Sequence, residues 1–203
     1  MLNRREERDV TTLEAFCTYY SEAGSANTVP TLEIARRRAD ELGIEHVLVA
    51  STTGETGAMA AEAMPGGRVI VVSHSAGFAA PNQQEMEEAY RVRIEAAGSR
   101  VLTCQHALGG VGRAVRRKLG SYQIDEIIAF TLRLLGDGLK VACEISLMAT
   151  DAGLVRSGEE VIAVGGTGHG ADTAAVIRAA NAQDLFDLRV LEILCKPRSQ
   201  RRP

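Results

Sequence analysis

The sequence predicts a single three-layer α/β/α domain with a mostly parallel central sheet. Strand-like and helix-like segments alternate along nearly all of the 203 residues, as in repeated β-α-β crossovers. Several strand-like segments are continuous apolar runs, which is typical of strands covered by helices on both faces. No linker divides the chain, so we expect one domain at residues 16–197, between an extension at residues 1–15 and a basic tail at residues 198–203.

The first half of the sequence predicts three strands and three helices. Residues 28–42 favour a helix because Leu32, Ala35 and Ala39 fall on one stripe, while the arginines between them face outward. The other elements follow from β-branched apolar runs or from helical periodicity. They are strands at residues 16–21, 46–50 and 68–73, and helices at residues 55–64 and 84–97.

The second half predicts one helix and four more strands. Residues 139–148 (LKVACEISLM) are assigned to a strand because apolar residues alternate there with Lys140, Glu144 and smaller side chains in a period of two. The helix is expected at residues 124–135, and the other strands at residues 101–104, 161–165 and 188–195.

Composition and charge argue against a nucleic-acid-binding, membrane-spanning or secreted protein. The formal net charge of −3 gives no general attraction to nucleic acid or membrane, and no apolar run approaches the roughly 18 residues of a spanning helix. Residues 1–10 lack the apolar segment of a secretory signal, so we expect a cytoplasmic protein. The four cysteines are far apart and the histidines lack metal-ligand spacing, so reduced thiols and no metal site are expected.

The loops that follow the predicted strands are the places to look for chemistry, because ligands of such sheets bind beyond the carboxyl ends of strands, at helix N-termini. They are residues 51–57, 73–78 and 165–173, with residues 150–153 as a fourth. In the first loop, Thr52 and Glu55 match a capping box, which would only start a helix. The full set of hydroxyl and glycine residues instead favours an anion site where Gly54 lets a phosphate approach the backbone, although Glu55 would repel it.

Three other features admit more than one interpretation. Gly166, Gly168 and Ala171 have the spacing of a dinucleotide fingerprint, but they leave too few residues for the rest of such a domain, so a tight glycine turn is simpler. Glu144 is a candidate general base, or the ion-pair partner of Lys140. The sequence also contains a basic cluster, which consists of Arg113, Arg116, Arg117 and Lys118. This cluster predicts either a solvated surface or a contact with phosphate.

Three blocks carry a resemblance to the C-terminal α/β domain of pyruvate kinase. Residues 47–77 contain a strand, a Ser/Thr-rich glycine turn that opens a small-residue helix, a proline and a second strand. Residues 138–153 (GLKVACEISLMATDAG) and 161–180 (VIAVGGTGHGADTAAVIRAA) are similar to small stand-alone members of that family, with Ala179 in place of an expected proline. The resemblance covers most of the chain after about residue 18.

This resemblance implies a domain that serves regulation and subunit contacts in the full kinase. The turn at residues 51–56 matches the one that grips a sugar bisphosphate effector in many of these kinases, and some stand-alone relatives are associated with flavin mononucleotide (FMN). It does not imply pyruvate kinase activity, because no catalytic barrel matches these 203 residues.

We therefore expect a homo-oligomeric protein that binds a phosphorylated small molecule, with FMN as the leading candidate and no nucleic-acid or membrane partner. Whether it is an enzyme stays open. The alternatives are a small enzyme that uses His74, Glu144 or Asp151 as acid or base, and a structural subunit. The expected binding residues are Ser51, Thr52, Thr53, Gly54, Glu55, Thr56, Ser73, His74, Gly77, Gly165, Gly166, Thr167, Gly168, Asp172 and Thr173.

Overall fold

The core is a seven-stranded sheet in a computed structural model that describes residues 12–199. The strand order is β1-β7-β6-β5-β2-β3-β4. Strands β2 (Val47–Ala50), β3 (Val69–Ser73), β4 (Arg100–Thr103) and β5 (Glu160–Gly165) run parallel. Strand β6 (Thr173–Arg178) is antiparallel to β5 and to β7 (Arg189–Pro197), and β1 (Thr18–Tyr20) is parallel to β7. The predicted α/β fold with a mostly parallel sheet is confirmed.

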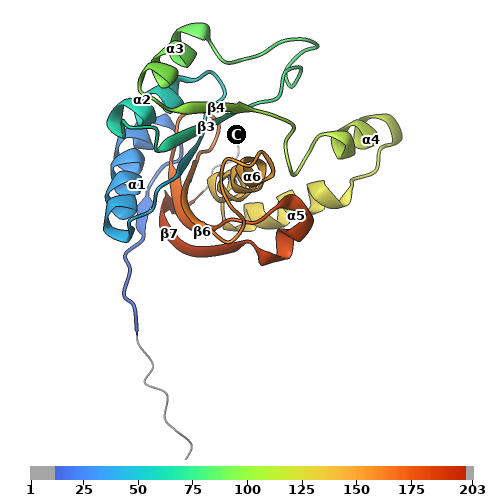
Figure 1. The fold of residues 1–203 in the computed structure, drawn as a ribbon. Coiled ribbons are helices and arrows are strands. Elements are labelled where there is room, and N and C mark those ends of the chain that lie inside the picture. Colours follow the sequence, from blue (N-terminus) through green and yellow to red (C-terminus); the bar gives the residue numbers. More distant parts are fainter. Residues whose placement is uncertain (1–11, 200–203) are drawn as a thin grey trace, which may run out of the picture.

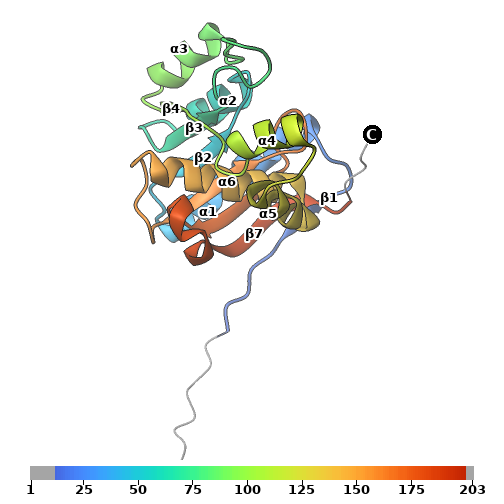
Figure 2. The ribbon, with the colours of Figure 1, turned by 90° about the vertical axis from the view of Figure 1, so that its right-hand side faces the viewer.

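Helices cover both faces of the sheet (Figure 1). On one face lie α1 (Thr28–Leu42), α2 (Glu55–Ala63) and α3 (Glu88–Ala96); on the other lies α6 (Asp137–Asp151). Side chains at successive positions of β2 pack on opposite faces of the sheet. Val47 and Val49 pack with α1 and α2, whereas Leu48 packs with α6. Figure 2 shows α5 (Ile124–Leu132) beside α6, with α4 (Val111–Leu119) next to α5. Short 3-10 helices span Ser25–Asn27, Arg133–Leu135 and Ala182–Asp187.

Residues 139–148 correct a prediction, because they form α6 and not a strand. Nearly every residue of α6 from Gly138 to Thr150 is buried, so the helix shows no single apolar stripe. Its polar residues bond along the helix axis, with Ser146 Oγ donating to Ala142 O and Thr150 Oγ1 donating to Ser146 O, both at 2.8 Å. In a helix that is buried on all sides, small and polar residues are not confined to one face. The period of two at residues 139–148 therefore does not indicate a strand.

Besides the short 3-10 helices, one α-helix and one strand were not predicted. Helix α4 carries the basic cluster, and β6 follows the glycine-rich loop at residues 165–173. Because this loop joins antiparallel strands and opens no helix, the dinucleotide fingerprint is excluded. The glycines belong to a loop at residues 166–172, which is longer than the tight turn that we expected. The predicted boundaries of the other elements lie within a few residues of those observed.

The terminal segments lie mostly outside the described residues. Of the predicted extension at residues 1–15, the structure describes only residues 12–15, which have no regular secondary structure; of the basic tail it describes Arg198 and Ser199. The Arg198 amide donates to Tyr20 O at 2.9 Å, which continues the pairing of β7 with β1. Within residues 12–199, no helix is long and apolar enough to cross a bilayer. The four cysteines are free thiols.

Helix α6 approaches β5 at a glycine pair. A Cβ atom on Gly165 would lie 2.4 Å from Gly138 O, and one on Gly138 would lie 2.2 Å from Thr173 Oγ1. Neither glycine has a positive φ, so close packing explains why a side chain is missing at both positions. This contact holds the first turn of α6 against the carboxyl end of β5.

We expect Gly165→Ala to lower the free energy of unfolding by about 1–3 kcal/mol, because the new methyl group meets backbone and forces α6 to shift. Urea denaturation followed by circular dichroism measures the change. Gly109→Ala is the matched control, since the nearest atom there, at 3.2 Å, is the movable end of Arg113; it should cost less than about 0.5 kcal/mol. Equal effects would contradict the importance of this contact.

Candidate functional site

A cavity of about 840 Å³ lies at the carboxyl ends of the parallel strands. Its walls come from the segments that follow β2, β3, β4 and β5, together with α6 and the start of α1. Parallel strands bring these segments to one edge of the sheet, where ligands of open α/β sheets bind. The cavity is therefore the candidate site.

The loop at residues 51–56 forms one wall and leads into α2. Ser51, Thr52, Thr53, Glu55 and Thr56 line the cavity. The Gly57 amide donates to Ser51 Oγ at 3.1 Å, and the Ala58 amide donates to Gly54 O at 2.8 Å. A helix leaves its first amides without intrahelical acceptors, so the start of α2 presents N–H donors and the positive end of the helix dipole.

The capping box is absent, and the role expected for Gly54 needs correction. Gly54 itself is the N-cap residue, with no side-chain cap, so Thr52 and Glu55 do not form the reciprocal pair. Gly54 has φ 101°, and a Cβ atom there would lie 2.6 Å from Tyr90 Cβ on α3. Helix packing and the left-handed backbone therefore explain this glycine, not the approach of an anion.

His74 lies directly after β3, and its two ring nitrogens contact two other residues of the cavity wall. Its Nδ1 lies 2.8 Å from Glu85 Oε2, and its Nε2 lies 3.4 Å from Thr52 Oγ1. Its ring contacts those of Phe78 and His106, with centroids 4.1 and 5.1 Å away. Sequence reasoning predicted His74 but missed Glu85 and His106, which only the folding of two loops brings to this wall.

A buried charged cluster closes the cavity from the side of α6. Glu144 Oε2 pairs with Lys140 Nζ and lies 3.6 Å from His106 Nδ1, while Glu144 Oε1 accepts the Leu108 amide at 3.0 Å. Burial alone would raise the pKa of Glu144, but His106 and Lys140 outweigh it and lower this pKa to about 2. Burial lowers the pKa of Lys140. The predicted Lys140–Glu144 pair is confirmed, although it lies on a helix.

The glycine-rich loop after β5 contributes Gly166 and Gly168 to the lining. Asp172 is fully buried and serves the loop itself: its Oδ2 accepts the amides of Gly24 and Thr167, and its Oδ1 accepts the Thr173 hydroxyl. Asp172 and Thr173 thus hold the loop in place and do not line the cavity. Their bonds fix the position of the glycines that do.

A sequence profile of the family described as "Pyruvate kinase, alpha/beta domain" matches residues 30–178, most of the chain. The chain belongs to the pyruvate kinase α/β-domain family. Two crystal structures of pyruvate kinase from Cryptosporidium parvum, and one of that organism's enzyme with ADP, align with 16% identity and TM-scores of 0.37–0.39. The alignments cover 74% of this chain and 22–23% of those, so the chain spans less than a quarter of their length.

The family match extends from α1 to β6 and includes the lining segments that follow β2, β3, β4 and β5, whereas β1, β7 and the lining residues Ser25, Thr28 and Val29 lie outside it. Of the fifteen predicted binding residues, the lining includes Ser51, Thr52, Thr53, Glu55, Thr56, Ser73, His74, Gly166 and Gly168. Six others lie behind or beside it, namely Gly54, Gly77, Gly165, Thr167, Asp172 and Thr173. Asp151 is also outside, because its Oδ1 accepts from Asn181 and the Ala182 amide.

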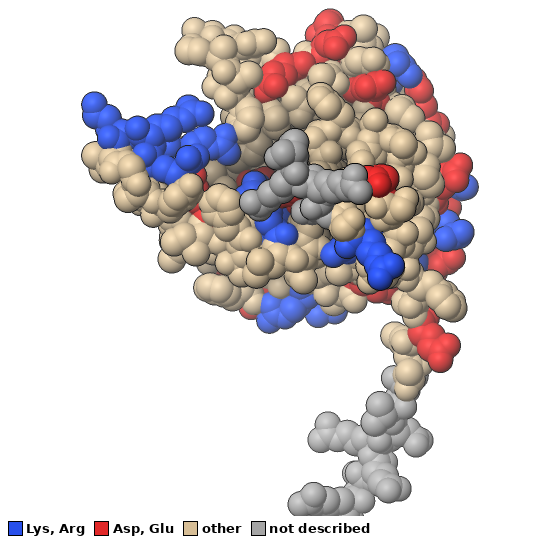
Figure 3. All heavy atoms as spheres, turned by 180° about the vertical axis from the view of Figure 1, so that it is seen from behind, with Lys and Arg blue, Asp and Glu red and all other residues tan. Residues whose placement is uncertain are grey.

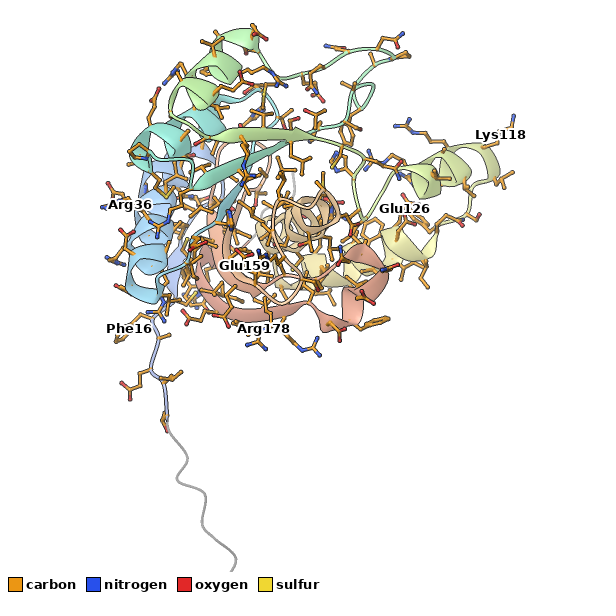
Figure 4. The ribbon with its side chains drawn as sticks, viewed as in Figure 1. Phe16, Arg36, Lys118, Glu126, Glu159 and Arg178 are labelled. Atoms are coloured by element: carbon orange, nitrogen blue, oxygen red, sulfur yellow. The ribbon has the colours of Figure 1, made fainter. Side chains whose placement is uncertain are left out.

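The basic cluster lies on α4, next to the cavity. Figure 3 shows Lys and Arg side chains gathered on this projecting helix, and Figure 4 places Lys118 at its outer end. Arg116 Nε donates to Glu126 Oε1 of α5 at 2.7 Å. Arg113, Arg117 and Lys118 line a second, smaller hollow of about 420 Å³ that shares His106 with the cavity. Arg116 is thus held by α5, and the role of the other three cations, in a solvated surface or in a phosphate contact, stays a prediction.

Removing one partner of the buried pair should be costly. We expect Lys140→Met to lower the free energy of unfolding by about 3–5 kcal/mol, because Glu144 stays charged and buried without its ammonium partner. The double variant Lys140→Met/Glu144→Gln should regain most of this loss, since the neutral amide still accepts the Leu108 N–H. Urea denaturation near neutral pH measures both. A double variant as unstable as Lys140→Met would contradict the assignment of the loss to an unpaired charge.

Proposed function

We propose that the chain binds a phosphorylated small molecule, with the phosphate at the start of α2. The observation that carries this proposal is the combination, on one wall of the cavity, of an α-helix N-terminus with three threonines, Thr52, Thr53 and Thr56. Helix amides and hydroxyl groups are donors that phosphate oxygens accept. The parallel strands hold these donors in a fixed arrangement before any ligand arrives.

The electrostatics of the cavity support an anionic ligand better than the number of carboxylates suggests. Glu144 pairs with Lys140, Asp137 lies 3.0 Å from Arg133, and the Glu85 carboxylate is hydrogen-bonded to His74. Glu55 is the first residue of α2 and is exposed, so it can turn toward solvent. Its charge still opposes a phosphate nearby, which makes it a test of the proposal.

FMN remains the first ligand to try. The cavity volume of about 840 Å³ suits a ligand of this size. The walls also carry apolar side chains, and Val72, Val141, Ile145 and Met148 are available to cover a flat ring system. The rings of His74 and His106 line the cavity and supply aromatic surface, and Phe78 packs against both of them. We assign no pyruvate kinase activity to the chain.

We expect Thr53→Val and Thr56→Val each to weaken binding of inorganic phosphate by about 1–3 kcal/mol, because each removes a hydroxyl donor to a charged group at nearly constant volume. Glu55→Gln should tighten binding by removing a repulsive charge. Isothermal titration calorimetry measures all three against the wild-type chain.

Thr131→Val is the matched control, since its hydroxyl donates to Ile127 O on α5, outside the cavity. Unchanged phosphate affinity in both cavity variants would contradict the proposed site. The same titrations with FMN decide the ligand: affinity that depends on Thr53 supports FMN, and affinity for phosphate without affinity for FMN removes it.

We also propose that the chain assembles with copies of itself through α5. Large apolar side chains are exposed along α5 and the 3-10 helix after it, including Ile124 at 76% and Leu134 at 84% exposure. A patch of this kind on one surface is typical of protein interfaces, and most soluble oligomers are symmetric assemblies of one chain. The exposed apolar side chains of α5 therefore give the proposed homo-oligomer a defined interface.

Sedimentation equilibrium should give a mass that is a multiple of 21.7 kDa, and the variant Ile124→Glu/Leu134→Glu should sediment as a single chain. The added charges would have to be desolvated in the interface. Val92→Glu, at an exposed apolar residue of α3 on the opposite face of the sheet from α6, should leave the mass unchanged. A wild-type mass near 21.7 kDa would overturn this proposal.

A further inference from the structure

Thr52, His74 and Glu85 form a hydroxyl–imidazole–carboxylate chain inside the cavity. Glu85 Oε2 lies 2.8 Å from His74 Nδ1, and Thr52 Oγ1 lies 3.4 Å from His74 Nε2. The carboxylate favours the tautomer that carries its proton on Nδ1, which leaves Nε2 free to accept the threonine proton. A nucleophile, a base and a third group that orients the base are the parts of an activated hydroxyl.

The position of the three residues suits catalysis. All three line the cavity, and the side chains of His74 and Glu85 keep 28% and 23% exposure, so a ligand can reach them. Thr52 stands between the end of β2 and the start of α2, where helix amides can stabilise negative charge that develops on a carbonyl oxygen. The apolar side chains of Val72 and Ile145 line the same cavity.

The Glu85–His74 contact is not needed to fasten its own loop. Gln84 Nε2 donates to His74 O at 3.1 Å, and the Met86 amide donates to Gln84 Oε1 at 3.0 Å, so Gln84 already closes the segment between β3 and α3. Elsewhere in the chain, His46 Nδ1 lies 2.5 Å from Glu159 Oε1, before β2 and therefore at the opposite edge of the sheet. That second pair (Glu159 is labelled in Figure 4) offers a comparison outside the cavity.

We propose that the chain hydrolyses esters of small acyl groups, with Thr52 as the nucleophile, His74 as the general base and acid, and Glu85 as the positioning residue. Thr52 Oγ1 bonds to the acyl carbon while its proton moves to His74 Nε2. The bond from that carbon to the leaving oxygen then breaks, and His74 returns the proton to this oxygen. A water molecule, deprotonated by His74, attacks the acyl carbon. The bond from that carbon to Thr52 Oγ1 then breaks, His74 returns the proton to Oγ1, and the acid leaves. This activity does not depend on the phosphate proposal.

The test uses p-nitrophenyl acetate with the purified full chain. We expect release of p-nitrophenolate with an initial burst, and an acetyl group on the peptide that contains Thr52, found by mass spectrometry after acid quench. Thr52→Ala should remove the acetyl-peptide, whereas Thr52→Ser should retain it. His74→Ala and Glu85→Gln should lower the hydrolysis rate by about 10²–10⁴-fold, because the base is lost or held in the wrong tautomer.

His46→Ala is the matched control, and it should hydrolyse the ester at the wild-type rate. Wild-type hydrolysis no faster than that of His74→Ala, or an acetyl group on another residue, would overturn the proposal. Should Thr52→Ala fail to melt like the wild type, the isosteric Glu85→Gln decides by rate alone. Hydrolysis inhibited by inorganic phosphate supports both proposals; hydrolysis that phosphate leaves unchanged supports the Thr52 nucleophile and contradicts the phosphate site.

Discussion

The close contact between α6 and β5 is the constraint that shapes the cavity of this protein. Because Gly138 and Gly165 carry no side chains, the first turn of α6 lies directly on the sheet. The helix then runs beneath the carboxyl ends of β2 and β5, and it presents Val141, Glu144 and Ile145 to the cavity as one wall. A larger residue at the contact would lift this wall and change the cavity. The packing of one buried helix therefore links the stability of the core to the shape of the site.

The buried charges on α6 also connect the core of the protein to the cavity. An ion pair inside a protein loses hydration that its attraction rarely repays in full, and the Lys140–Glu144 pair lies where apolar residues would serve the core as well. Glu144 also accepts the Leu108 amide and faces His106, so it holds the segment after β4 against the cavity. The Nε2 atom of His106 is buried without a hydrogen-bond partner among the described residues. Charge is thus concentrated around the cavity, as in sites where a protein positions polar groups for a ligand.

The sequence predicted much of the fold because most strands are continuous apolar runs and most helices have clear stripes. It failed for α6, where burial on all sides removes the helical stripe and leaves an alternation that resembles a strand, and it missed β6, which lies inside a glycine-rich segment. Loops that follow strands predicted the location of the cavity and nine of its lining residues. Glu85 and His106 could not be predicted, since their neighbours in the cavity are brought together by loop conformations that no local pattern encodes. Gly54 was identified correctly as special, but packing against Tyr90 is the reason.

The central claim is that the N-terminus of α2, facing α6 across the cavity, is the ligand site of this domain. Amide chemical-shift mapping of the ¹⁵N-labelled chain during titration with inorganic phosphate tests it most directly, because it reports every backbone N–H at once. We expect the largest saturable shifts on residues 52–57 and on the neighbouring residues after β3. Shifts confined to α4 and its basic cluster, or no saturable shift in residues 52–57, would contradict it.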